Sequence, residues 1–113
     1  MNFWMVLKII AALATAATGL LAFARPAATY GFIGLSANGV RGVSEIRAIF
    51  GGLFIALGLA PLFLGATAYQ MLGIGYLTIA AARAFSMMFD KSYAPSNTIS
   101  LVIEIVLGAI LII

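Results

Sequence analysis

Long apolar segments alternate with short polar breaks along this chain of 113 residues. The apolar segments cover residues 3–24, 44–65, 66–89 and 98–113. The first three have the roughly 20 residues that a helix needs to cross the hydrocarbon core of a bilayer, and the last is slightly shorter. No charge occurs between Arg47 and Arg83, which is too long a run for one ordinary helix. Pro61 and the step that begins at Gly65 therefore predict a tight turn within it.

Composition indicates a membrane protein. Apolar residues make up 65% of the chain and charged residues 8%, whereas soluble domains average about half and about a quarter. Four spans leave little room for anything else. We therefore expect an all-α fold, a four-transmembrane-helix bundle that forms one polytopic membrane domain over residues 1–113, with the lipid bilayer as its first partner.

The first apolar segment has two interpretations. As a retained span it contains Lys8 within its first two turns, from where the ammonium group reaches the interface. Alternatively, Lys8 begins a cleaved signal peptide whose cleavage site is residues 22–24, just before Arg25. The apolar and aromatic residues before Lys8 suit a membrane-embedded helix better than a short charged leader. Both interpretations stay open.

The residue types that the chain lacks narrow its chemistry. Cysteine and histidine are absent, which excludes disulfides, thiolate nucleophiles, imidazole bases and the usual zinc or haem ligation. We therefore expect no catalytic residues, no metal, no cofactor and no enzymatic activity. The six basic residues are scattered through apolar sequence and form no patch, so nucleic acid is not an expected partner.

Positive charges predict the orientation in the membrane. Four spans put the connections, residues 25–43 and 90–97, on one side and both termini on the other. The basic residues on the connection side are Arg25, Arg41, Arg47 and Lys91. Lys8 is on the terminal side. The positive-inside rule therefore predicts cytoplasmic connections and external termini in a cell membrane.

Two charges lie deep inside predicted spans. Arg83 is seven residues before Asp90. Glu104 is seven residues after Asn97, so both charges lie about 10 Å below the cytoplasmic face at 1.5 Å per helical residue. An unpaired charge in mid-membrane costs about 2.5–3.5 kcal/mol on insertion scales, which a partner offsets in part. We therefore predict an intramembrane ion pair between Arg83 and Glu104.

Polar residues at helical spacing extend this prediction. The supporting polar face consists of Tyr69, Tyr76, Asn97 and Ser100. They follow seven-residue spacing on the third span and three-residue spacing on the fourth, so the two polar faces should meet. Glu45 and Arg47 enter from the same side of the membrane, about one turn deep. The predicted charge cluster is therefore Glu45, Arg47, Arg83 and Glu104.

This cluster has a structural and a functional interpretation. In the structural one, the Arg83–Glu104 pair locks the third and fourth helices in register, while Glu45 and Arg47 mark the interface. In the functional one, the cluster lines a small cavity that binds an ion, a polar solute or a lipid headgroup, because ionisable groups inside membranes often mark pathways. The sequence favours the structural interpretation and leaves the functional one open.

Small residues at four-residue spacing predict where helices pack closely. On the second span they are Ala48, Gly52, Ala56 and Ala60, and on the first they are Ala11, Thr15 and Gly19. Such spacing lets helix backbones approach each other. We expect this contact to be within the bundle, with contact between copies as the alternative.

The stretch SEIRAIFGGLFIALG, residues 44–58, carries a family resemblance. Together with a third-span arginine and a fourth-span glutamate, it resembles the small bacterial four-helix membrane proteins grouped as domain of unknown function 4345. The matching steps are Glu45-Ile46-Arg47 and Phe50-Gly51-Gly52, followed by Arg83 and Glu104; Ser44 and Phe50 stand where asparagine and tyrosine are expected. The resemblance covers roughly residue 34 to the C-terminus. It implies a four-helix membrane fold, a location in a bacterial inner membrane and a site to test, but no activity.

These observations predict a non-enzymatic integral membrane protein. We expect an interaction or accessory module that assembles with itself or with a larger membrane complex. Its expected partners are therefore a second copy of the chain or other membrane proteins. The alternative is a small solute or ion carrier that uses the intramembrane Glu/Arg cluster.

Overall fold

The computed structural model describes residues 2–113, which form helices and no strand. The elements are α1 (Phe3–Ala24), η1 (Pro26–Thr29), α2 (Tyr30–Ile33), α3 (Val40–Glu45), η2 (Ile46–Leu53), α4 (Phe54–Leu64), α5 (Ala66–Phe89) and α6 (Pro95–Ile112). Because α3, η2 and α4 follow one another without a break, they form one helix of 25 residues, Val40–Leu64. Four helices are thus long and apolar enough to span a membrane, which confirms the predicted all-α fold with four spans.

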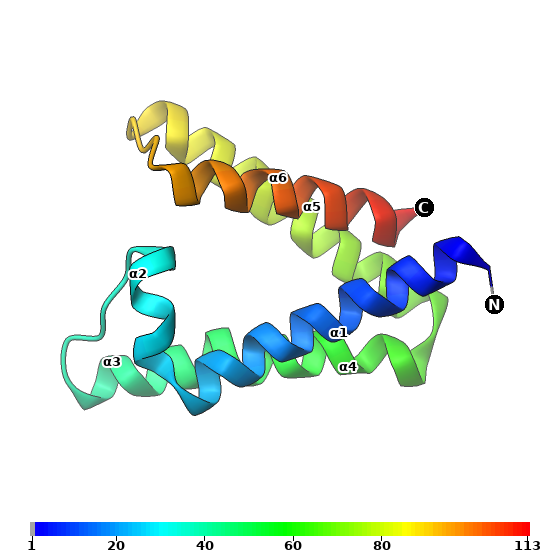
Figure 1. Ribbon diagram of the computed structural model, residues 1–113, viewed down its shortest axis with the longest axis horizontal. Coiled ribbons are helices and arrows are strands. Elements are labelled where there is room, and N and C mark those ends of the chain that lie inside the picture. Colours follow the sequence, from blue (N-terminus) through cyan, green and yellow to red (C-terminus); the bar gives the residue numbers. More distant parts are fainter. Residues whose placement is uncertain (1) are drawn as a thin grey trace.

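The four long helices form two antiparallel hairpins (Figure 1). In one hairpin α1 packs along η2 and α4, and in the other α5 packs along α6. The hairpins meet at the end of the molecule where both chain termini lie, and they diverge toward α2 and the α5–α6 connection (Figure 1). The whole is flat, with extents of 44 × 31 × 17 Å.

Short local signals begin and end these helices. The side chain of Asn2 accepts a hydrogen bond of 2.8 Å from the Met5 nitrogen and caps α1. A single residue, Gly65, separates α4 from α5, and its φ of +83° is a conformation that favours glycine. The two hairpins are therefore joined covalently through one very tight turn.

Two helices begin earlier than the sequence predicted. The second span starts at Val40 instead of residue 44, because Gly39 with a φ of +86° starts the helix there. The fourth starts at Pro95 instead of residue 98, since proline is tolerated in the first helical turn. Ala94 is consequently the N-cap of α6. The first connection also contains the short helical elements η1 and α2.

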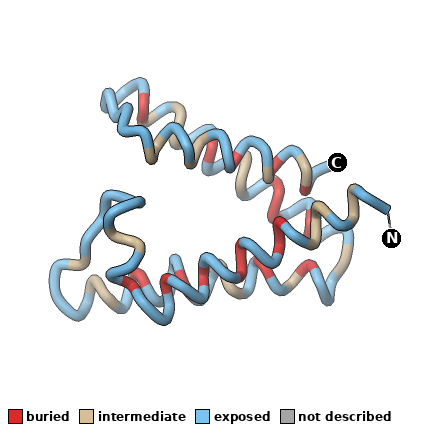
Figure 2. The backbone as a smooth tube through the Cα atoms, in the orientation of Figure 1, coloured by how far each residue is buried: buried red, intermediate tan, exposed pale blue. Residues whose placement is uncertain are grey.

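The hydrophobic core lies where the two hairpins meet. Its fully buried members are Ala11, Ala12, Tyr69, Leu72 and Leu111. Buried residues follow the contact lines within each hairpin and this junction (Figure 2). Most large apolar side chains instead face outward, and Phe63 is 82% exposed. Such a surface suits a surrounding of lipid and not of water.

On α1 the predicted residues Ala11, Thr15 and Gly19 are buried, but on the second span the contact uses a different face from the one predicted. Gly51 and Gly58 face α1, and a Cβ added to Gly51 would lie 2.9 Å from the Cβ of Phe23. The predicted contact residues face elsewhere: Ala48, Gly52 and Ala56 are exposed and Ala60 is half-buried. The reason is packing, because a Cβ at Gly51 or Gly58 would collide with Phe23 or Ala16 of α1, and glycine lets the two helices approach. Gly51 and the buried residue Ile46 lie in η2, a π-helical segment.

Candidate functional site

The ion pair between Arg83 and Glu104 joins α5 to α6. The Nε of Arg83 donates to Oε1 of Glu104 over 2.8 Å, and its Nη2 donates to Oε2 over 2.7 Å. This is the bidentate geometry in which a guanidinium binds a carboxylate most strongly. The Glu104 side chain is 10% exposed and that of Arg83 is 31% exposed. The structure thus brings together the two charges predicted to pair.

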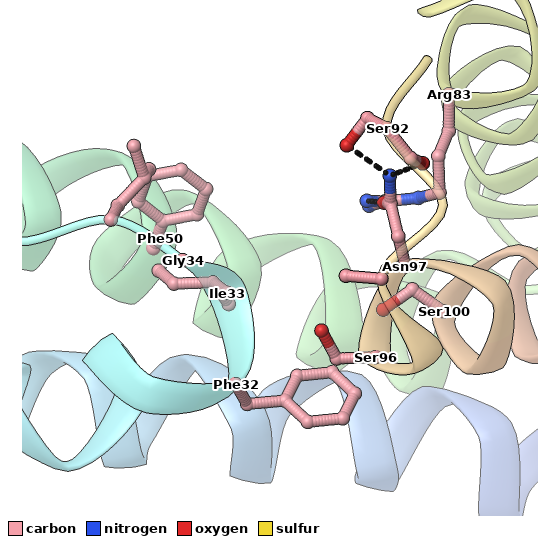
Figure 3. A pocket seen from close by; sticks show the side chains of 11 residues that line it. Phe32, Ile33, Gly34, Phe50, Arg83, Ser92, Ser96, Asn97 and Ser100 are labelled. Atoms are coloured by element: carbon pink, nitrogen blue, oxygen red, sulfur yellow. Dashed lines mark hydrogen bonds between the residues drawn. The ribbon is translucent and has the colours of Figure 1, made fainter. Parts of the chain in front are cut away.

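Asn97 also forms a hydrogen bond with the guanidinium of Arg83. Its Oδ1 accepts a hydrogen bond of 2.7 Å from Nη1 of Arg83. Its Nδ2 donates to the main-chain oxygen and the hydroxyl of Ser92, over 3.0 and 3.2 Å (Figure 3). Asn97 therefore links the guanidinium to the α5–α6 connection and fixes the direction in which the guanidinium faces.

The end of α5 positions Ser92 for this network. Lys91 has a φ of +54°, in the left-handed region, and the Ser92 nitrogen donates over 3.0 Å to the carbonyl oxygen of Met87. Because Ser92 is the second residue after the C-cap Asp90, this hydrogen bond forms a Schellman motif, a common end of a helix. It turns the chain sharply and brings Ser92 back toward the first turns of α6.

A cavity of about 400 Å³ opens beside Arg83 between the diverging ends of the hairpins. One wall is polar and is formed by Arg83, Ser92, Ser96, Asn97 and Ser100. The other wall is apolar and includes Phe32, Ile33, Gly34, Leu35 and Phe50. Figure 3 shows Phe32 and Ile33 across the cavity from Ser96, Ser100 and Arg83. Sequence analysis missed this apolar wall because nothing in residues 25–43 indicates that α2 folds back against α6.

Glu45 and Arg47 do not join this cluster, which corrects the predicted set of four charges. Glu45 forms an ion pair with Arg41, one turn earlier on the same helix, and both side chains are exposed. The Nη1 of Arg47 donates over 2.8 Å to the carbonyl oxygen of Phe23, one of the last carbonyls of α1. The early start of α3 places Glu45 beside Arg41, and the unpaired carbonyls at the end of α1 attract Arg47.

The predicted polar face divides between two contacts. Asn97 binds Arg83, and Ser100 lines the same cavity. Tyr69 instead lies in the core at the hairpin junction. The hydroxyl of Tyr76 forms a hydrogen bond with the Thr15 hydroxyl on α1. Because the Thr15 hydroxyl donates to the Ala11 carbonyl oxygen over 2.8 Å, Tyr76 is the donor in the bond between them.

The arrangement suits recognition of an anion or another hydrogen-bond acceptor. A guanidinium carries five N–H groups, and the bonds to Glu104 and Asn97 use one on each nitrogen of Arg83. One N–H on Nη1 and one on Nη2 are therefore left for another acceptor. Residues 2–113 contain no group of three or more side chains that could together hold a metal ion.

Four helices are apolar and long enough to span a membrane, and the charges of Arg83 on α5 and Glu104 on α6 pair with each other. The chain is therefore of the class of multi-pass membrane proteins. A family model described as "Domain of unknown function (DUF4345)" matches residues 4–113, so the chain belongs to this family. The family resemblance expected from the sequence is confirmed, and the match extends over α1 as well. A search of curated proteins and a search of solved structures returned no match.

Proposed function

We propose that the protein is a non-catalytic binding module of the cell membrane, with its ligand site in the cavity beside Arg83. The observation that carries this proposal is the hydrogen bonding of the Arg83 guanidinium and its position beside a cavity. It is held by Glu104 and Asn97, yet it lines a cavity of about 400 Å³ and keeps two N–H groups unused. A side chain that served only to lock two helices would not need an adjoining space of this size.

The same geometry favours binding over transport. A carrier built on four charges would need Glu45 and Arg47 near the cavity, and both are engaged elsewhere. The charge of Glu104 is balanced by that of Arg83, which donates three hydrogen bonds to it. The site is therefore an electrically balanced donor surface, which suits a bound polar group with no requirement for ion movement.

Native mass spectrometry tests the proposal on protein extracted in a mild detergent. We expect the wild type to retain a small polar or anionic molecule. Ser100→Leu fills the cavity without touching the Arg83 network and should abolish retention. Thr98→Leu makes a similar change at an exposed position on the same helix, outside the cavity lining, and should retain the molecule. Equal occupancy in the two variants, or none in the wild type, would contradict the proposal.

A second candidate function, an accessory module that assembles with itself or a larger membrane complex, is favoured by the outward face of the second span. Ala48, Gly52 and Ala56 are exposed, and a Cβ on Gly52 would have its nearest neighbour, the Arg47 carbonyl oxygen, at 3.9 Å. A second helix could approach closely there. Gly52→Ile should lower the oligomeric mass measured by light scattering in detergent while leaving the helical content unchanged. An unchanged mass would remove this candidate.

A further inference from the structure

We propose that the ligand is a single-chain anionic amphiphile, whose acidic head binds Arg83 and whose chain lies in the groove between α4 and α5. This inference rests on the proposed function and names the chemical class that the site takes. Its basis is the series of cavities that begins at Arg83 and continues toward the junction of the hairpins.

The cavities share lining residues in succession. Arg83 and Asn97 line the 400 Å³ cavity and also a neighbouring shallow one of about 350 Å³. Ile79 lines this shallow cavity and an apolar one of about 210 Å³. A fourth, of about 370 Å³, shares Leu57, Met71 and Leu72 with the third. We infer that these cavities form one path, which runs from the guanidinium beside α6 and then between α4 and α5 to the turn at Gly65.

The path changes from polar to apolar within about one helical turn. Around Arg83 one wall of it is formed by serine and asparagine side chains. From Ile79 onward its lining is aliphatic and aromatic, and it includes Leu53, Phe54 and Leu57 of the facing helix. The Tyr76 hydroxyl does not offer a hydrogen bond to this part of the path, because it donates to Thr15. A molecule with one polar end and one long apolar end matches this lining.

Gly75 keeps the apolar part of the path open. It lines the 210 Å³ cavity, and a Cβ added to it would meet no atom within 4 Å. A glycine inside a helix costs about 1 kcal/mol relative to alanine. No neighbouring backbone requires glycine here, in contrast to Gly58, whose added Cβ would meet Ala16. The space at Gly75 is therefore open to a ligand chain.

The charges near the mouth of the path favour an acidic head. The unused N–H groups of Arg83 suit a phosphate or carboxylate oxygen, which a guanidinium binds in a planar geometry. Lys91 lies on the α5–α6 connection, and Arg25, Arg41 and Arg47 lie around the other connection at the same end of the molecule. Glu104 and Glu45 are each paired with an arginine. With Arg83 and Asp90 counted, this end carries five positive and three negative side chains, so the positive charges exceed the negative ones.

The length of the path fits an alkyl chain. Arg83 and Thr67 are the first and last residues of α5 along it, and 16 residues of helix span about 24 Å. Lipid tails are as apolar as the groove, so apolar burial is not itself a source of affinity in a membrane. A chain that fills the groove raises the affinity by holding the head beside Arg83, and the hydrogen bonds from Arg83 supply the selectivity for charge.

Titration by ³¹P NMR in dodecyl maltoside micelles tests this proposal with two probes, dodecyl phosphate and inorganic phosphate. We expect the wild type to bind dodecyl phosphate saturably and at least about tenfold more tightly than inorganic phosphate, since only the first fills the groove. Gly75→Leu blocks the groove in open space and should weaken dodecyl phosphate binding about tenfold, with inorganic phosphate unaffected. Gly52→Leu, the same change on the outward face, should bind both probes as the wild type does.

The outcomes separate this proposal from the proposed function. Equal affinity for the two probes would mean that the site takes a free anion and no chain. Ile79→Trp is a second variant that blocks the groove. If both Gly75→Leu and Ile79→Trp bound dodecyl phosphate with the affinity of the wild type, the chain would not lie in the groove. If Ser100→Leu loses its retained molecule while neither phosphate probe binds the wild type, the proposed function stands and the acidic amphiphile is wrong.

Discussion

Gly58 of α4 lies against the backbone of Ala16 of α1, so closely that a Cβ built on Gly58 would be 2.4 Å from the Ala16 nitrogen. The same Cβ would be 2.6 Å from the carbonyl oxygen of Ala12. Neither atom belongs to a flexible side chain, so the two helices would have to move apart to accept it. The first hairpin therefore depends on the absence of a side chain at this position.

Gly58→Ala should lower the free energy of unfolding by about 2 kcal/mol, because overpacking outweighs the roughly 1 kcal/mol by which alanine favours a helix. Circular dichroism during unfolding in mixed micelles with increasing dodecyl sulfate measures the change. Gly52→Ala is the control, since its added Cβ has its nearest neighbour at 3.9 Å. We expect it to be neutral or slightly stabilising. Equal loss in the two variants would mean that α1 does not pack on the Gly58 face.

Breaking the ion pair should be costly and partly reversible by a second substitution. Glu104→Gln leaves Arg83 without its counter-charge and should destabilise the protein by about 1–3 kcal/mol, the range for a hydrogen-bonded charge that loses its partner. In Arg83→Gln/Glu104→Gln neither residue is charged, and part of the loss should be recovered. A double-mutant cycle measures the coupling between the two residues, for which we expect about 1–3 kcal/mol. Strictly additive losses would show that the pair contributes no coupling.

The hydrogen bond from Tyr76 to Thr15 should contribute modestly to the junction of the hairpins. Tyr76→Phe removes the hydroxyl and keeps the ring, so we expect a loss of about 0.6 kcal/mol, the average for hydrogen bonds between membrane helices. Unfolding in mixed micelles gives the value. Thr78→Val is a suitable control, because its hydroxyl bonds only within its own helix, to the Ile74 carbonyl oxygen over 2.8 Å. A larger loss at Thr78 than at Tyr76 would contradict this account.

The orientation proposed from the positive charges can be tested with single cysteines, since the chain has none of its own. Ser36→Cys lies in the connection between α2 and α3, and Ile113→Cys follows α6. In intact cells a membrane-impermeant maleimide should label only Ile113→Cys, if the termini are external and the connections cytoplasmic. Labelling of Ser36→Cys alone would show that the orientation is the opposite of the predicted one. The same reagent after lysis should label both variants.

Sequence reasoning succeeded where distance along a helix was enough. The level of Arg83 and Glu104 follows from counting seven residues from each end of a short polar connection, and the hairpin of α5 and α6 then brings them face to face. The four spans follow from apolar length alone. Neither inference needs to know how the two hairpins are placed relative to each other.

Sequence reasoning failed where the phase of a helix mattered. Small residues at four-residue spacing indicated the face of Gly52, whereas the close contact with α1 is on the neighbouring face of Gly51 and Gly58. The prediction that Glu45 joins the charge cluster was also wrong. The helix starts at Val40, so Glu45 pairs with Arg41, one turn earlier on the same helix. The cavity wall formed by α2 was not predictable, since it depends on how the first connection folds back in space.

The turn at Gly65 has a mechanical consequence. It is the covalent link between the two hairpins, and the cavity beside Arg83 lies near the far end of α5. The 24 residues of α5 make a lever arm of about 36 Å, so a rotation of about 5° at the junction displaces its far end by about 3 Å. Such a displacement is comparable to the length of a hydrogen bond. A small hinge movement at one membrane face would therefore be amplified into opening or closing of the site at the other.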